Sequence, residues 1–143
     1  MAYPSGMVLA DTSVVHRADR SSTVRDHLDN LSERYLLATC ATVDLELGQS
    51  ARTAPEHQAL AELRARLLID LPLTKEVIAR ARHVQGLLAA RGLHRGVGPA
   101  DLLIAACAEV HGALVLHYDR DYDHIAAVTG QPAQWLAAPG DLP

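Results

Sequence analysis

Three aspartates at alternate positions follow directly on an apolar run late in the chain. The stretch LVLHYDRDYDHI (114–125) contains Asp119, Asp121 and Asp123. Carboxylates this close to one another repel, and each loses hydration if the end of the apolar segment is enclosed. A divalent cation would offset both effects, so this stretch suggests a metal site.

Three further acids lie in separate segments. Asp11 interrupts the apolar stretch VLADTSVV, Glu46 lies early in a helical pattern, and Asp101 follows a glycine-rich loop. Glu46 suits a solvated helix face and Asp101 a helix N-terminus, but a charge inside an apolar strand serves no packing purpose. Because ligands of open α/β sheets bind beyond the carboxyl ends of the strands, we expect these acids to meet Asp119 at one edge. Oxygen ligands of this kind suit Mg²⁺ or Mn²⁺ better than zinc.

Short apolar segments alternate with helical patterns along the whole chain. Strands are predicted at 7–15, 34–40 and 113–118, with 68–73 as an edge strand or an extended connection because it contains a proline. Helices are predicted at 21–31, 42–51, 56–68, 75–91, 100–112 and 121–129. This order predicts a three-layer α/β/α domain with a central, mostly parallel sheet and helices on both faces.

The composition is that of a globular domain. The 143 residues are 49% hydrophobic and 21% charged, and the formal net charge of −4 does not attract nucleic acid by itself. We interpret 1–143 as one domain in which residues 1–6 form a loose N-terminal leader. No apolar run approaches the ~20 residues of a membrane span, and no signal peptide is evident. Cys40 and Cys107 form no CxxC pair, which favours reduced core thiols and a cytoplasmic location.

Four blocks of the sequence occur in the order of a known family. They are VLADTSVV (8–15), TVDLELG (42–48), GVGPADLLIAACA (96–108) and LVLHYDRDYDHIA (114–126). Together they resemble the PIN-domain nucleases, and most of all the VapC-type toxins of bacterial toxin–antitoxin pairs. The resemblance implies an acidic quartet that holds metal, made of Asp11, Glu46, Asp101 and Asp119. Asp121 matches an additional acid of some members, and Thr12 or Ser13 matches the small hydroxyl residue beside the first aspartate.

The resemblance also implies an activity and partners. We expect a divalent-metal-dependent endoribonuclease that cleaves RNA by metal-activated water and leaves a 5′-phosphate and a 3′-hydroxyl. We further expect a cognate antitoxin whose C-terminal segment blocks the acidic site, with an arginine that pairs with the acids in place of metal. A homodimer is expected as well. The apolar stripes of 21–31 and 56–68 are candidate contact surfaces, and intramolecular core is the alternative for both.

Basic residues near the acids are candidates for contacts to RNA phosphates. We expect some of Arg91, His94, Arg95 and Arg120 to make such contacts, and ordinary solvated side chains are the alternative for each.

Two other functions compete with the nuclease. A non-catalytic module of the same fold would bind antitoxin or RNA without cleaving it, although the complete quartet argues against this. A phosphatase of the haloacid dehalogenase type is less favoured, because its DxD signature belongs near the start of that fold and DRDYD lies near the end of this chain.

Overall fold

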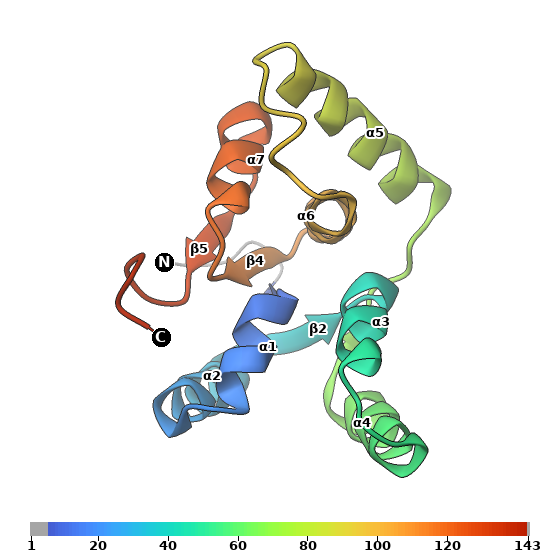
Figure 1. The fold of residues 1–143 in the computed structure, drawn as a ribbon, viewed down its shortest axis with the longest axis vertical. Helices are drawn as coiled ribbons and strands as arrows, with labels where there is room; N and C mark the ends of the chain where they lie inside the picture. The colour runs from blue at the N-terminus through green and yellow to red at the C-terminus, as the bar shows by residue number, and fades with distance from the viewer. Residues whose placement is uncertain (1–5, 143) are drawn as a thin grey trace.

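The computed structural model describes residues 6–142 and shows an α/β fold (Figure 1). Its elements are β1 (Met7–Ala10), α1 (Thr12–Ala18), α2 (Ser22–Arg34), β2 (Leu36–Thr39), α3 (Ala41–Gln49), α4 (Ala54–Leu67), β3 (Ile69–Asp70), α5 (Lys75–Ala89), α6 (Pro99–His111), β4 (Leu114–His117), α7 (Asp121–Thr129) and β5 (Ala133–Trp135). The predicted leader, residues 1–6, lies outside the described residues except for Gly6. None of the helices in the described part of the chain is long and apolar enough to cross a membrane.

One five-stranded sheet with the order β3-β2-β1-β4-β5 forms the centre of the fold. Every pair in it is parallel, and the proline-containing segment forms the edge strand β3, as predicted. The strands β1 and β4 are neighbours in register, with Ala10 opposite Leu116. The Asp11 backbone N–H extends this pairing by donating to the Leu116 carbonyl at 2.8 Å. The residues that follow β1 and β4 therefore emerge side by side.

Alternating side chains of the inner strands divide the core into two layers. Leu9 of β1 and Val115 of β4 belong to the larger cluster, which is filled by α3, α5, α6 and α7. Val8 and Leu114 point to the opposite face and pack with residues of α1 and α2. This two-sided burial confirms the three-layer prediction, and helices on both sides of the sheet are visible in Figure 1.

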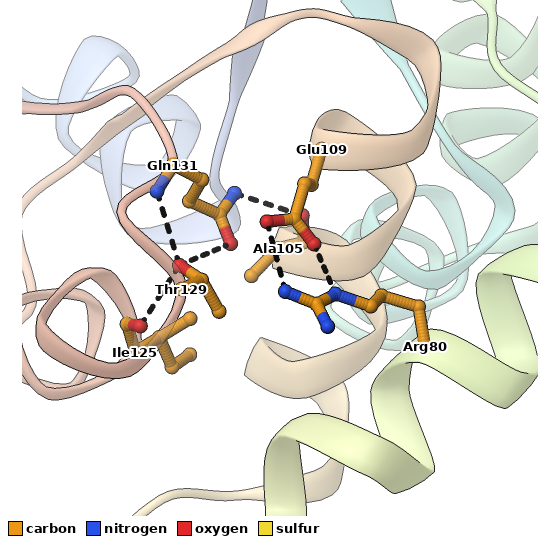
Figure 2. Close-up of polar contacts among 6 residues, drawn as sticks. All are labelled: Arg80, Ala105, Glu109, Ile125, Thr129 and Gln131. Carbon is orange, nitrogen blue, oxygen red and sulfur yellow. Dashed lines mark hydrogen bonds and ion pairs between the residues drawn. The ribbon is translucent and has the colours of Figure 1, made fainter. Parts of the chain in front are cut away.

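Polar contacts fix the packing around α6, the helix that carries Asp101 at its start (Figure 2). The Arg80 guanidinium of α5 makes a forked ion pair with Glu109 near the other end of α6. The Gln131 side chain, which is buried, donates to the Ala105 carbonyl of α6 at 2.9 Å. Contacts from α5 and from Gln131 therefore both help to hold α6 in place.

The first predicted strand is too long. The strand ends at Ala10, and α1 begins at Thr12 because the Asp11 carboxylate caps the helix by accepting from the Ser13 backbone N–H. The predicted strand 7–15 thus contains a strand, a cap and the first turn of a helix. The two cysteines are buried free thiols, as predicted.

Candidate metal centre

The predicted quartet lines one cavity at the carboxyl edge of the sheet. The cavity has a volume of about 500 Å³, and all four predicted acids line it, namely Asp11, Glu46, Asp101 and Asp119. They come from the end of β1, from α3, from the first turn of α6 and from the segment after β4. The fifth predicted acid, Asp121, begins α7 beside Asp119.

The Asp11 carboxylate is held at both of its oxygens. It is only 3% exposed. Its Oδ2 accepts from the Ser13 backbone N–H at 3.1 Å and from the Ser13 hydroxyl at 2.6 Å. Its Oδ1 accepts from the Tyr122 hydroxyl at 2.7 Å. Ser13 Oγ in turn accepts from the Tyr118 backbone N–H at 3.1 Å, so the hydroxyl that holds Asp11 is itself fixed.

The Thr12 hydroxyl, next to Ser13 in the chain, contacts a different acid. Thr12 Oγ1 donates to Glu46 Oε1 at 2.8 Å, a contact that joins the start of α1 to α3. The sequence left open whether Thr12 or Ser13 is the hydroxyl residue beside the first aspartate. In the structure both hydroxyls contact acids, Ser13 its neighbour Asp11 and Thr12 the distant Glu46.

Three carboxylates are close enough to share one cation. Oxygen atoms of Asp101, Asp119 and Asp121, one from each, all lie within 4.8 Å of one another. The Asp121 backbone N–H donates to Asp119 Oδ1 at 2.9 Å, which keeps this pair together. The all-oxygen donor set and its spacing fit a hard divalent cation, and the structure itself identifies no ion.

The acids destabilise one another's charged forms in the absence of a cation. Burial, together with the charges of Asp11 and Asp119, raises the pKa of Asp101 from 3.8 to about 7. Burial and the charge of Asp119 also raise the pKa of Asp121. A cation would remove this penalty by neutralising the charge, so the electrostatics of the cavity agree with the geometry.

An aromatic layer supports the cavity from the core side. The Tyr122 ring is buried and stacks on His117, with ring centroids 4.9 Å apart, and His117 also contacts the Trp135 ring at 5.0 Å. Burial lowers the pKa of His117, which favours its neutral form. Burial and the nearby Asp11 carboxylate raise the pKa of Tyr122, so its hydroxyl stays a donor.

One wall of the cavity is not acidic, and the sequence analysis missed it. His16 of α1 lines the cavity together with Gln49 and Ser50 at the end of α3. Gln49 and Ser50 follow Glu46 by three and four positions, so helical spacing would have placed them beside it. His16 lies just beyond the predicted strand 7–15, and the helix that carries it, α1, was not predicted.

The four basic residues expected to contact RNA do not line the acidic cavity. They are Arg91, His94, Arg95 and Arg120, all of them among the described residues. Their contact with RNA stays a prediction.

Comparisons with known proteins agree with this fold. The PIN domain family matches residues 8–128. Ribonuclease VapC21 of Mycobacterium tuberculosis is 45% identical over 132 residues, which are 92% of this chain and 95% of the relative. Ribonuclease VapC51 of the same species is 47% identical over 135 residues, 94% and 96% of the two chains.

Solved structures of toxin–antitoxin complexes share the fold. VapBC2 from Rickettsia felis, bound to a promoter DNA fragment, superposes with a TM-score of 0.76 at 16% identity, covering 90% of this chain and 98% of that one. FitAcB from Neisseria gonorrhoeae superposes with a TM-score of 0.68 at 21% identity, covering 89% and 96%. With the extended similarity to the mycobacterial sequences, these matches show that the chain belongs to the PIN-domain family and, within it, to the VapC proteins.

Proposed function

We propose that the protein is the toxin of a toxin–antitoxin pair, a Mg²⁺- or Mn²⁺-dependent endoribonuclease built as one PIN domain over 1–143. The observation that carries the proposal is the gathering of acids from separate elements. Four of them line one cavity, and oxygens of Asp101, Asp119 and Asp121 lie within 4.8 Å of one another. The curated relatives with 45% and 47% identity are named ribonucleases, which supports the same activity here.

The acids have distinct positions in the proposed site. Asp11, Asp101 and Asp119 would hold the metal, with Glu46 completing the quartet across the cavity and Asp121 as an additional ligand. When bound, the cations supply an activated water and neutralise charge on the phosphodiester. The chain's own contribution is orientation, because Ser13 fixes the Asp11 carboxylate.

RNA must approach an acidic cavity, and the non-acidic wall offers the route. His16, Gln49 and Ser50 contribute uncharged hydrogen-bonding groups to the lining of the cavity. These groups would contact the RNA backbone next to the scissile phosphate, where the carboxylates alone would repel it.

Cleavage of RNA by the purified protein tests the activity. We expect cleavage in Mg²⁺ or Mn²⁺ that a chelator abolishes. Asp11→Asn and Asp101→Asn should each remove it while the circular dichroism spectrum is retained, and Asp26→Asn on the exposed face of α2 is the matched control. Unchanged RNase activity in the two site variants would show that the site assignment is wrong. Hydrolysis of a generic phosphomonoester that depends on Asp119 would instead support the phosphatase.

The antitoxin would occupy an apolar groove beside α4. The stripe of α4 is not core: Leu63 is 47% and Leu67 66% exposed, and no residue of α4 is buried. These side chains and Leu60 line a groove of about 200 Å³ whose other walls come from α1, α2, β2 and α3. By contrast, Val24 and Leu31 of α2 are buried, so the stripe of that helix is intramolecular core.

The groove leads to the acidic cavity. A hollow of about 690 Å³ shares Leu60 and Leu63 with the groove, and it shares His16 and Ser50 with the cavity. A partner segment with an apolar helix followed by an arginine would therefore fill the groove and reach the carboxylates. A toxin–antitoxin complex from Klebsiella pneumoniae is among the solved structures that share this fold, which supports an antitoxin as the occupant.

Expression in cells tests the toxin assignment. Induction of the protein should arrest growth, co-expression of the neighbouring gene should relieve the arrest, and Asp11→Asn should cause none. Arrest that persists in Asp11→Asn would favour the non-catalytic module. Sequencing the 5′ ends of cellular RNA after brief induction would identify the target.

The proposal also includes a homodimer in the cytoplasm. Leu45 on α3 is 74% exposed and is available for contact with a second copy. The buried free thiols Cys40 and Cys107 suit a reducing compartment. Light scattering of the purified protein tests the dimer, and a monomer at micromolar concentration would contradict it.

A further inference from the structure

We infer that the Tyr122 hydroxyl is a positioning group of the metal centre, which holds the Asp11 carboxylate in its ligating orientation before the cation binds. The inference rests on the proposed function, since it assigns a role to a residue beside the proposed ligands. Tyr122 carries a phenol and not a carboxylate, and it would not bind the ion itself. Its effect would pass through Asp11.

The contact distances single out Asp11 as the acceptor. The Tyr122 hydroxyl lies 2.7 Å from Asp11 Oδ1 and 3.4 Å from Asp101 Oδ1. A hydroxyl has one hydrogen, and the shorter contact is the one with the length of a strong O–H···O⁻ bond. The Tyr122 hydroxyl oxygen therefore also faces Asp101, a second proposed ligand, in the first turn of α6.

Together with Ser13, Tyr122 fixes the Asp11 carboxylate from opposite sides. Two donors of Ser13 satisfy Oδ2, and Tyr122 satisfies Oδ1. Oδ2 accepts two bonds and Oδ1 accepts one, so Oδ1 keeps a lone pair for a cation and Asp11 need not give up its partners. Hydrogen bonds to ligating carboxylates orient them in this way in many metal sites.

The hydroxyl is held in place by packing of the ring. Tyr122 is 1% exposed and stacks on His117 with centroids 4.9 Å apart. It lies in the first turn of α7, directly after Asp121 and three residues after Asp119. The turn that carries Asp119 and Asp121 thus also carries Tyr122. Its hydroxyl contacts a third acid, Asp11, which lies near the start of the chain.

Removing only the hydroxyl separates positioning from packing. Tyr122→Phe keeps the buried ring and its contact with His117, and it leaves Asp11 Oδ1 without this donor. Without this donor the Asp11 carboxylate would repel Asp101 more strongly. Part of the binding free energy of the cation would then be used to orient Asp11. We therefore expect weaker metal binding in a protein that is still folded.

A titration with Mn²⁺, followed by the electron paramagnetic resonance signal of the free ion, tests the inference without RNA. The Mn²⁺ Kd of Tyr122→Phe should rise by about ten-fold. Tyr35→Phe, which removes a phenol hydroxyl at the far end of α2, should leave it unchanged. In RNA cleavage, the Mn²⁺ concentration for half-maximal rate should rise by the same factor. The rate at saturating Mn²⁺ should stay within about threefold of the parent, because the ion then orders the carboxylate.

Three outcomes count against the inference, and they can be distinguished. If Asp11→Asn weakens Mn²⁺ binding and Tyr122→Phe binds as tightly as the parent, the hydroxyl does not position the ligand and the proposed function stands. If the parent protein binds no Mn²⁺ in this cavity, the proposed function fails and this inference with it. A ring replacement that unfolds the protein, seen by circular dichroism, would show a structural role and count against positioning.

Discussion

Replacing Asp101 with asparagine should stabilise the metal-free protein at pH 8. The pKa of Asp101 is raised to about 7, so folding favours its neutral form. The corresponding stability is fully present below about pH 3.8 and is lost as the pH rises through about 7. Ionising such a carboxyl costs roughly 4 kcal/mol if it is fully buried, and solvent in the open cavity lowers this to about 1–2 kcal/mol. Asparagine has nearly the same shape and carries no charge.

Urea unfolding in chelator at pH 5 and pH 8 measures this effect. At pH 8 the free energy of unfolding of Asp101→Asn should exceed that of the parent by about 1–2 kcal/mol. At pH 5 the difference should be smaller, because it disappears only as the pH falls to about 3.8. Added Mn²⁺ should stabilise the parent more than the variant, because it relieves a repulsion that the variant lacks. Asp26→Asn, on the exposed face of α2, should show none of these differences. A variant less stable than the parent at pH 8 would refute the reasoning.

Three further substitutions test other contacts. Thr12→Val removes the hydroxyl that holds Glu46, and RNA cleavage should fall by about 10–100-fold with the fold retained, as measured by initial rates. Leu63→Glu places a charge in the groove beside α4, so antitoxin binding should weaken at least about ten-fold in calorimetry while RNase activity is kept. Arg80→Met removes the ion pair with Glu109 and should lower the free energy of unfolding by about 1 kcal/mol without changing metal affinity.

The sequence predicted the elements that local patterns encode. The alternation of apolar segments and helical stripes predicted the three layers. The residue types at the helix ends agree with the predicted ranges, because Thr74 caps the start of α5 and Gly112 ends α6. The position of acids after apolar segments predicted which edge they would share. Asp11 was the most informative, because an acid inside an apolar run has few structural explanations.

The remaining features depend on contacts between distant segments. Nothing local shows that Asp11 also caps a helix, because Val14 and Val15 continue the apolar, β-branched pattern after it. The stripe of α4 has the spacing of a core helix, and only the packed structure shows that no neighbour covers it. The Tyr122 hydroxyl meets Asp11 across 111 positions of the chain, a separation that no helical or strand period connects.

The connection between groove and cavity leads to a last prediction, that antitoxin and metal compete. Ionised carboxylates in the cavity would be neutralised either by a divalent cation or by a guanidinium from the partner. The hollow that shares His16 and Ser50 with the cavity would bring that guanidinium to the carboxylates. By linkage, each must then weaken the other by the same factor. Calorimetry of antitoxin binding in chelator and in saturating Mn²⁺ should give a Kd at least about five-fold higher with the metal. Equal affinities would mean that the partner stops short of the carboxylates and inhibits from the groove alone.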